Sequence, residues 1–302
     1  MKSDCRGEYE RDISKRIPLL KTEFMLQRIK ILLVFVFMWA GNCLDAAPQK
    51  IVSLAPSLTR SIHYLDAEEL LVGVTTFCFI AHNKEKEIVA SAISVNVEKV
   101  ITLKPDLVVT TAMTKPATIE LLRRAGIRVE VFETPKSFEE ICLQFDRLGK
   151  LIGRQEKAQS INRDVRERVT RIKESHQYNH PPTFFFQIGA NPLFTVLENT
   201  FMDDYITFSG GRNIAAGFTR GTINREFVLA GNPDVIIIVN MGIASDEEKK
   251  NWERYPFLNA VKNERIFFLE SDMASTPNPP DFLKTMEAIR ENLEEGWWKD
   301  DI

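Results

Sequence analysis

Apolar residues recur at helical spacing in one stretch of the chain, and an unbroken apolar run follows that stretch. The spaced positions are Val97, Val100, Ile101 and Leu103, which predict a short amphipathic helix. Pro105 should end this helix, because proline restricts the residue before it and lacks an amide hydrogen. Residues 107–111 are apolar or β-branched, which favours a buried parallel strand. Residues 96–111 therefore predict a helix that leads into a strand.

A second copy of this pattern occupies residues 224–239. Four residue types recur at the same spacing in both copies: Asn96, Glu98, Pro105 and Asp106 in the first, and Asn224, Glu226, Pro233 and Asp234 in the second. An apolar run again comes directly after the aspartate. Two copies of one helix-and-strand unit, far apart in the chain, indicate two similar α/β lobes.

The remaining pattern alternates strands and helices. Further strands are expected at 50–55, 71–75, 127–132, 183–188 and 265–269, and helices at 56–65, 116–125, 201–208, from Ser245, and at 280–294. Residues 76–94 show no regular pattern. The repeated strand–helix–strand order predicts parallel sheets with helices on both faces.

A long charged helical pattern without a break runs from Gln155 to about Gln177, and we interpret it as a rigid spine between the lobes. The predicted organisation is an N-terminal α/β lobe at 48–153, a linking helix at 154–179 and a C-terminal α/β lobe at 180–302.

Residues 1–47 are expected to be a targeting segment. Arg28 and Lys30 precede an uncharged apolar run at 31–40, which is short for a membrane span, and small residues follow. This order is typical of a secretory signal peptide, and a single membrane anchor is the alternative. Residues 1–24 are polar and charged, so they are interpreted as an extension before a true start at Met25.

The cysteines leave two questions open. Cys43 is a candidate for lipid attachment, although Ala40-Gly41-Asn42 matches the usual lipoprotein pattern poorly. Cleavage near Ala46 or Ala47 would leave Cys78 and Cys142, which either pair in an oxidising compartment or remain two small buried thiols.

Composition and motifs argue against several classes of function. The apolar share of 44% and the charged share of 27% are those of an ordinary globular protein, and the net charge of −3 argues against a nucleic-acid partner. Glycine-rich nucleotide loops, a nucleophile elbow and the His-Glu-x-x-His zinc motif are missing from the sequence. We therefore expect no catalytic residues, no resident metal and no cofactor.

Glu98 and Glu226 stand at equivalent places in the two repeats. Each follows an asparagine that can cap a helix, and a carboxylate near a helix N-terminus is favourable in itself. As a pair, one on each lobe, they would form two exposed anionic points suited to docking on a partner with matching cations.

Several segments in order resemble the periplasmic binding proteins that carry cobalamin, ferric siderophores and haem to ATP-binding-cassette importers. These segments are Lys-Ile-Val-Ser-Leu-Ala-Pro-Ser at 50–57, Leu-Val-Gly-Val-Thr at 71–75, residues 96–108 and Phe-Ser-Gly-Gly-Arg-Asn-Ile-Ala at 208–215. Residues 185–194 are most similar to the cobalamin-binding members. The resemblance covers almost all of the chain after residue 47.

The resemblance implies two Rossmann-like lobes joined by one long helix, with a ligand cleft between them and little hinge motion. It implies that Glu98 and Glu226 dock onto permease arginines, and that the protein is a periplasmic monomer with a metal chelate as cargo. By correspondence the ligand contacts are Ser57, Phe77, Ala92, Thr111, Phe194, Arg220 and Met273.

The pocket departs from the cobalamin pattern. Phe77 replaces a stacking tyrosine, and the family's tryptophans correspond to Ala92, Thr111 and Arg220. The family's Pro-Ser-x-Thr-Glu turn ends here in Arg60. A cationic Arg220 at the cleft would favour an anionic chelate, such as a carboxylate siderophore or a haem propionate, although a solvated loop arginine is equally compatible. An extracytoplasmic sensor, or a chelatase-like enzyme on the same two-lobed fold, remains the alternative hypothesis.

Overall fold

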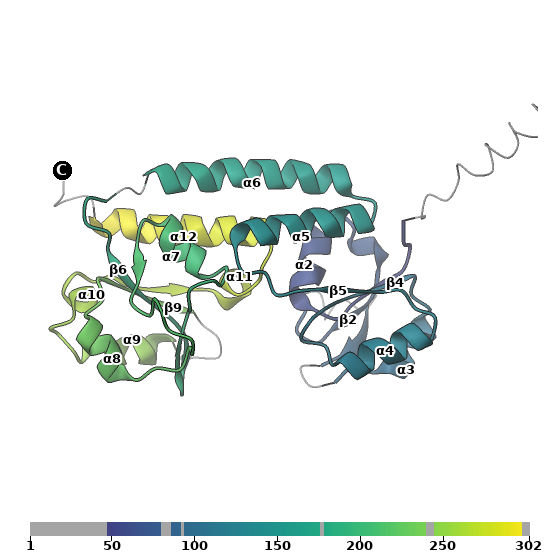
Figure 1. Ribbon diagram of the computed structural model, residues 1–302, viewed down its shortest axis with the longest axis horizontal. Coiled ribbons are helices and arrows are strands. Elements are labelled where there is room, and N and C mark those ends of the chain that lie inside the picture. The colour runs from purple at the N-terminus through teal and green to yellow at the C-terminus, as the bar shows by residue number, and fades with distance from the viewer. Residues whose placement is uncertain (1–46, 80–85, 92–93, 176–177, 240–244, 298–302) are drawn as a thin grey trace, which may run out of the picture. The chain divides into compact units, whose positions relative to one another are not determined.

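The computed structural model of the protein describes residues 47–297 except 80–85, 92–93, 176–177 and 240–244 (Figure 1). The expectations for the signal peptide, Cys43 and Ala92 lie outside these described residues. Residues from Ala47 onward form one compact unit. No helix within the described ranges combines the length and the apolar character that crossing a membrane requires.

The first sheet has five parallel strands in the order β3-β2-β1-β4-β5. Their bounds are β1 Ile51–Ser53, β2 Leu71–Thr75, β3 Glu87–Ala90, β4 Leu107–Thr111 and β5 Val129–Phe132. The interpretation of 76–94 as irregular was wrong for β3. This strand is four residues long and lies at the edge of the sheet with β2 as its one neighbouring strand, so its sequence lacks the long apolar run of a central strand.

Helices cover both faces of this sheet, as the strand–helix alternation predicts. They are α2 Pro56–Tyr64, α3 Val97–Leu103, α4 Pro116–Arg124 and α5 Phe138–Leu151, with a short 3-10 helix at Glu68–Leu70. Successive residues of β4 point to opposite faces: Val108 packs with α3 and α4, whereas Leu107 and Val109 pack with α2 and α5.

The second sheet has the order β10-β9-β6-β7, with β8 paired to β6. The strands are β6 Thr183–Ala190, β7 Leu193–Thr195, β8 Arg212–Asn213, β9 Val235–Val239 and β10 Ile266–Leu269. All of the pairs are parallel except β6 with β7. Only Asn191 and Pro192 separate β6 from β7, and so short a connection can join only antiparallel strands.

The helices of the second half are α7 Asp203–Phe208, α8 Arg225–Gly231, α9 Ser245–Glu253, α10 Asn259–Lys262, α11 Ser271–Ala274 and α12 Pro279–Trp297. The predicted spine is α6, Gln155–Ser175, which lies along α5 and α12 (Figure 1). Val165, Val169 and Ile172 of α6 are buried in the core shared with α12. The two sheets and the long helix confirm the predicted fold.

The two repeats are alike in their atomic detail. The side chains of Asn96 and Asn224 each accept a 2.9 Å hydrogen bond from the backbone amide three residues on, and so cap α3 and α8. Both helices end at a left-handed residue, Lys104 with φ 50° and Asn232 with φ 39°.

The aspartates of the repeats tie each unit to the first strand of its sheet. Asp106 Oδ2 accepts hydrogen bonds from the amides of Gln49 and Lys50, and Asp234 Oδ2 accepts from the amide and hydroxyl of Thr183. Partial burial opposes ionisation of Asp234, but these hydrogen bonds hold its pKa below the usual value. The Pro-Asp pair is therefore a structural anchor.

Candidate functional site

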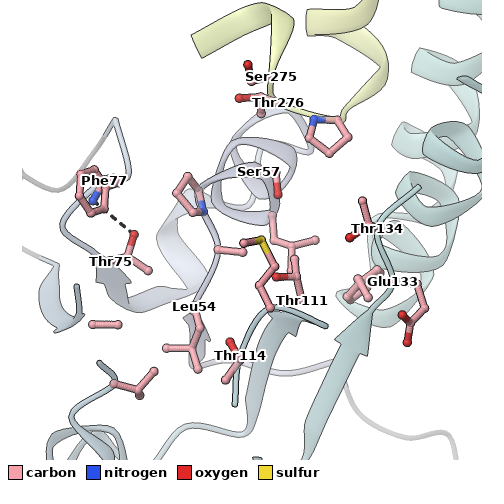
Figure 2. Close-up of a pocket in the computed structure, with 18 of the residues that line it drawn as sticks. Leu54, Ser57, Thr75, Phe77, Thr111, Thr114, Glu133, Thr134, Ser275 and Thr276 are labelled. Atoms are coloured by element: carbon pink, nitrogen blue, oxygen red, sulfur yellow. Dashed lines mark hydrogen bonds between the residues drawn. The ribbon is translucent and has the colours of Figure 1, made fainter. Parts of the chain in front are cut away.

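A cavity of about 500 Å³ opens at the carboxyl ends of the strands of the first sheet (Figure 2). Its wall is built largely from residues at or after the ends of the five strands of this sheet. Phe201 and residues 275–277 of the C-terminal half complete it. Ligands of parallel α/β sheets bind at this edge, and the volume lies within the ~300–1,000 Å³ range of small-molecule sites.

Hydroxyl groups and apolar side chains dominate the cavity wall. The hydroxyl-bearing residues are Ser57, Thr75, Ser91, Ser94, Thr111, Thr114, Thr118, Thr134, Ser275 and Thr276. Lys115 and Glu133 are the lining residues that carry a charge. Phe77 and Met113 are highly exposed at 66% and 88%, so both offer unburied apolar surface to a ligand. Such a wall suits a molecule with polar groups on an apolar body.

Local structure fixes how these side chains face the cavity. Ser57 lies in the first turn of α2, which begins at Pro56 without a side-chain cap. The amide of Phe77 donates to Thr75 Oγ1 at 3.3 Å, and this bond holds the turn after β2 (Figure 2). Ser275 and Thr276 lie on the opposite side of the cavity from Thr114 (Figure 2).

Cys78 lies immediately behind this turn and is not joined to Cys142. Both cysteines are buried free thiols. Cys78 Sγ lies 3.1 Å from Thr59 Oγ1 and 3.3 Å from Thr75 Oγ1. Burial raises the pKa of Cys142 to about 12, so that group stays a protonated thiol.

Three of the predicted ligand contacts meet in the cavity, namely Ser57, Phe77 and Thr111. Phe194, Arg220 and Met273 do not line it. Met273, on α11, is two residues before the lining residue Ser275.

Phe194 and Arg220 belong to a second group of residues near the carboxyl end of β6. Phe194 pairs with Gly189 of β6, and its ring packs on Gly221, where a Cβ atom would come within 2.4 Å of it. Arg220 precedes that glycine and is exposed.

The lining residues that sequence comparison missed fall into two sets. Met113, Thr114 and Lys115 follow β4 directly, so the rule that ligands bind at the carboxyl ends of parallel strands would have found them. Ser275 and Thr276 reach the cavity only because α11 and α12 pack beside α2. The sequence around these two residues contains no pattern that predicts this packing.

Glu98 and Glu226 are both exposed in the first turns of α3 and α8. Neither carboxylate forms an ion pair with another residue in the described part of the chain. Each helix packs on the face of its sheet that is turned away from α6. The two carboxylates thus remain available for a partner.

Arg60 does not take part in the cavity. Its guanidinium lies 3.4 Å from Asp272 and 3.4 Å from the fully buried Asp281 at the start of α12. Asp281 also accepts hydrogen bonds from Tyr64 Oη at 2.5 Å and Asn278 Nδ2 at 2.6 Å. Burial and the bond to Asp281 raise the pKa of Tyr64. This cluster joins α2 of the first half to α12 of the second.

The described part of the chain contains no candidate metal centre. Across the described ranges, no group of three or more histidine, cysteine or carboxylate side chains could hold an ion together. The convergent ligand cluster that would favour a chelatase-like enzyme is therefore not found in that part of the chain.

Comparison with known proteins places the chain in a family. Residues 51–273 match the family model described as periplasmic binding protein. The vitamin B12-binding protein of Vibrio cholerae is 27% identical over 267 residues, covering 86% of this chain and 94% of that protein. An uncharacterized ABC transporter substrate-binding lipoprotein, YvrC of Bacillus subtilis, is 29% identical over 82% of this chain and 80% of its own length.

Solved structures agree with this placement. The crystal structure of the periplasmic vitamin B12-binding protein BtuF of Vibrio cholerae superposes with a TM-score of 0.69 at 26% identity, over 82% of this chain and 98% of that one. The periplasmic heme-binding protein HutB of the same species gives 0.73 at 18% identity, over 81% and 98%, which shows a shared fold. The chain therefore belongs to the periplasmic binding protein family.

Proposed function

We propose that the protein binds a metal-chelate nutrient outside the cytoplasm and delivers it to an ATP-binding-cassette importer. The observation that carries this proposal is the cavity at the strand ends of a chain that belongs to the periplasmic binding proteins. The proposed role is capture and release without bond chemistry, because the importer supplies the free energy. A ferric siderophore, cobalamin or haem is the proposed cargo, and two of the named relatives are binding proteins for vitamin B12 and heme.

The chemical character of the residues that line the cavity indicates which kind of chelate would fit. Phe77 is the exposed aromatic surface of the lining, and hydroxyl-bearing residues make up much of the rest of the wall. A corrin or porphyrin ring gains from broad aromatic walls, whereas a chelate with many oxygen atoms gains from hydroxyl donors. Ala92, Phe194, Arg220 and Met273 remain predicted contacts of a ligand large enough to reach beyond the cavity.

Export and docking complete the proposal. Residues 1–47 would act as the signal peptide, with Cys43 as a less favoured lipid site, and the mature protein would work as a monomer. Glu98 and Glu226 would contact arginines of the permease subunits. Their exposure, equivalent positions and lack of an ion pair in the described part of the chain support this role.

A thermal-shift screen tests the binding function directly. The purified protein is melted with cyanocobalamin, haemin, ferric citrate and a ferric catecholate in turn. A chelate present at ~100 times its Kd stabilises the folded state by about 2.7 kcal/mol, which corresponds to a rise in Tm of roughly 5–10 °C. If none of these probes moves a cooperative melting transition, metal-chelate capture is rejected in favour of the sensor or enzyme hypothesis.

Phe77→Ala tests whether that chelate occupies the cavity. Loss of the exposed ring should weaken binding by roughly 2- to 12-fold in a titration, because an aromatic contact contributes about 0.5–1.5 kcal/mol. Phe79→Ala is the matched control, since that half-exposed ring packs on His63 and does not line the cavity. Equal losses in both variants would place the ligand elsewhere.

Charge reversal tests the docking role. Glu98→Lys and Glu226→Lys should each abolish uptake of the chelate by cells while leaving its affinity unchanged, because complementary charge sets the docking orientation. Glu120→Lys on α4 serves as the control, since Glu120 is also exposed but lies outside the repeat, where it pairs with Arg124 at 2.9 Å. Undiminished uptake with both reversals combined would rule the docking role out.

A further inference from the structure

Four side chains form a closed network beside Glu226, and we call them the Arg225 network: Arg225 of α8, Gln187 of β6, and Glu248 and Trp252 of α9. Arg225 Nη2 lies 2.5 Å from Glu248 Oε1. Gln187 Nε2 donates to the same carboxylate oxygen at 3.0 Å, and Trp252 Nε1 donates to Gln187 Oε1 at 2.8 Å. The guanidinium carbon of Arg225 lies 4.4 Å from the centroid of the Trp252 ring, which closes the network.

Three of the four side chains in the network are buried, which makes its geometry hard to change. Gln187 and Trp252 are fully buried and Glu248 is 4% exposed, whereas the side chain of Arg225 is 29% exposed. Loss of the contact with Arg225 or Gln187 would leave the buried carboxylate of Glu248 with fewer partners in a poorly solvated site, so the observed arrangement is preferred.

Arg225 lies in the first turn of α8 and immediately precedes Glu226. Because α8 has only seven residues, its orientation depends on tertiary contacts rather than on its own helix propensity. The network joins that first turn to α9 and to β6, and so holds the backbone that carries Glu226.

The other repeat secures its glutamate in a different way. Val97 takes the place of Arg225 before Glu98, and it packs against the apolar cluster of Val100 and Val108. The ion pair nearest to Glu98 in sequence, Lys99 with Glu87 at 2.7 Å, is open to solvent. The buried charged network therefore belongs to α8 and has no equivalent on α3 among the described contacts.

We propose that Arg225 is a positioning residue for docking: through its network it fixes Glu226 relative to Glu98, so that both carboxylates engage an importer at once. This inference rests on the proposed docking role of the two glutamates. Two contacts held in one rigid body can bind ~10²–10⁴-fold more tightly than either alone, but only when their spacing matches that of the partner. The structure assigns to the Arg225 network the task of keeping that spacing.

Pulsed electron–electron distance measurement between nitroxide labels tests this assignment without any importer. The labels are attached at Glu98→Cys and Glu226→Cys in the full chain with Cys5→Ser and Cys43→Ser. Cys78 and Cys142 are buried thiols, and the chain without the two introduced cysteines reports any background labelling. The compared variants are Arg225→Met, Arg225→Met with Glu248→Gln, and Lys99→Met as the matched control on α3.

We expect a single narrow distance peak in the parent and in Lys99→Met, and loss of that peak in both Arg225 variants. The double variant is decisive, because it removes both charges and leaves no buried ion unpaired, so it should fold even if Arg225→Met alone does not. A double variant that melts cooperatively and retains the narrow parental peak overturns the proposal, and so does equal broadening in Lys99→Met. Failure of the docking role itself would show only in the uptake experiment, so the two failures are distinguishable.

Discussion

The surroundings of Asp203 change the pKa of its carboxyl group. Asp203 is partly buried in α7, accepts a 2.9 Å hydrogen bond from Asn213 Nδ2, and lies near Glu198. Burial is the largest influence on Asp203, and together with the charge of Glu198 it raises the pKa of this group. The helix dipole that favours a carboxylate in a first turn does not remove this cost.

Asp203→Asn should therefore stabilise the protein at neutral pH. A raised folded-state pKa means that the favourable contribution of the carboxyl is present below its unfolded pKa and is lost as the pH rises through the folded value. Asparagine keeps an oxygen for Asn213 and carries no charge, so we expect Tm to rise by roughly 1–3 °C at pH 7. Melting curves should show no difference near pH 3, where both states are protonated. A lower Tm at pH 7 would contradict the prediction.

At the scale of elements, the caps of the two repeats make a matched pair. Asn96→Ala and Asn224→Ala each remove a 2.9 Å bond to a helix amide, so each should lower the free energy of unfolding by about 1 kcal/mol. Because the sites are far apart, the double variant should lower the free energy of unfolding by the sum of the two single effects, as measured by urea titration.

Asn96→Ser and Asn224→Ser keep a capping oxygen, so their free energies of unfolding should stay near that of the parent. Serine variants as unstable as the alanine variants would show that the amide serves another purpose.

The elements that were predictable from the sequence share a local cause. The units α3–β4 and α8–β9 combine periodic apolar positions, a capping asparagine and a proline boundary, and each of these signals acts within a few residues. The sequence did not predict β3, because this strand lies at the edge of the sheet beside a single neighbouring strand. An edge strand needs only a short apolar run, which is a weak signal in the sequence.

The lining of the cavity was predictable only in part. Ser57, Phe77 and Thr111 were assigned by family resemblance, and the structure places all three in the cavity lining, at or after the ends of β1, β2 and β4. Ser275 and Thr276 were missed because packing between distant helices, rather than sequence spacing, brings them to the cavity.

At the scale of the whole molecule, Asp281 connects the two halves through Arg60 and Tyr64. Removing one partner of a buried pair leaves the other without compensation, so Asp281→Asn should cost about 3 kcal/mol of unfolding free energy. Asp272→Asn is the matched control. Its carboxylate lies at the same 3.4 Å from Arg60 but is 78% exposed, so its loss should cost little. Urea titration compares them, and equal costs would mean that burial of Asp281 does not decide its contribution.

The repeat described for α3–β4 and α8–β9 has a constant offset, because 224 − 96 and 234 − 106 both equal 128. The chain thus carries two equivalent helix–strand units, and each presents a glutamate in the first turn of its helix. A partner made of two identical subunits would accept either orientation equally if the two ends were the same. They differ at the residue just before each glutamate, Val97 in one repeat and Arg225 in the other. Because of that difference, a partner made of two identical subunits would meet unlike surroundings at the two glutamates.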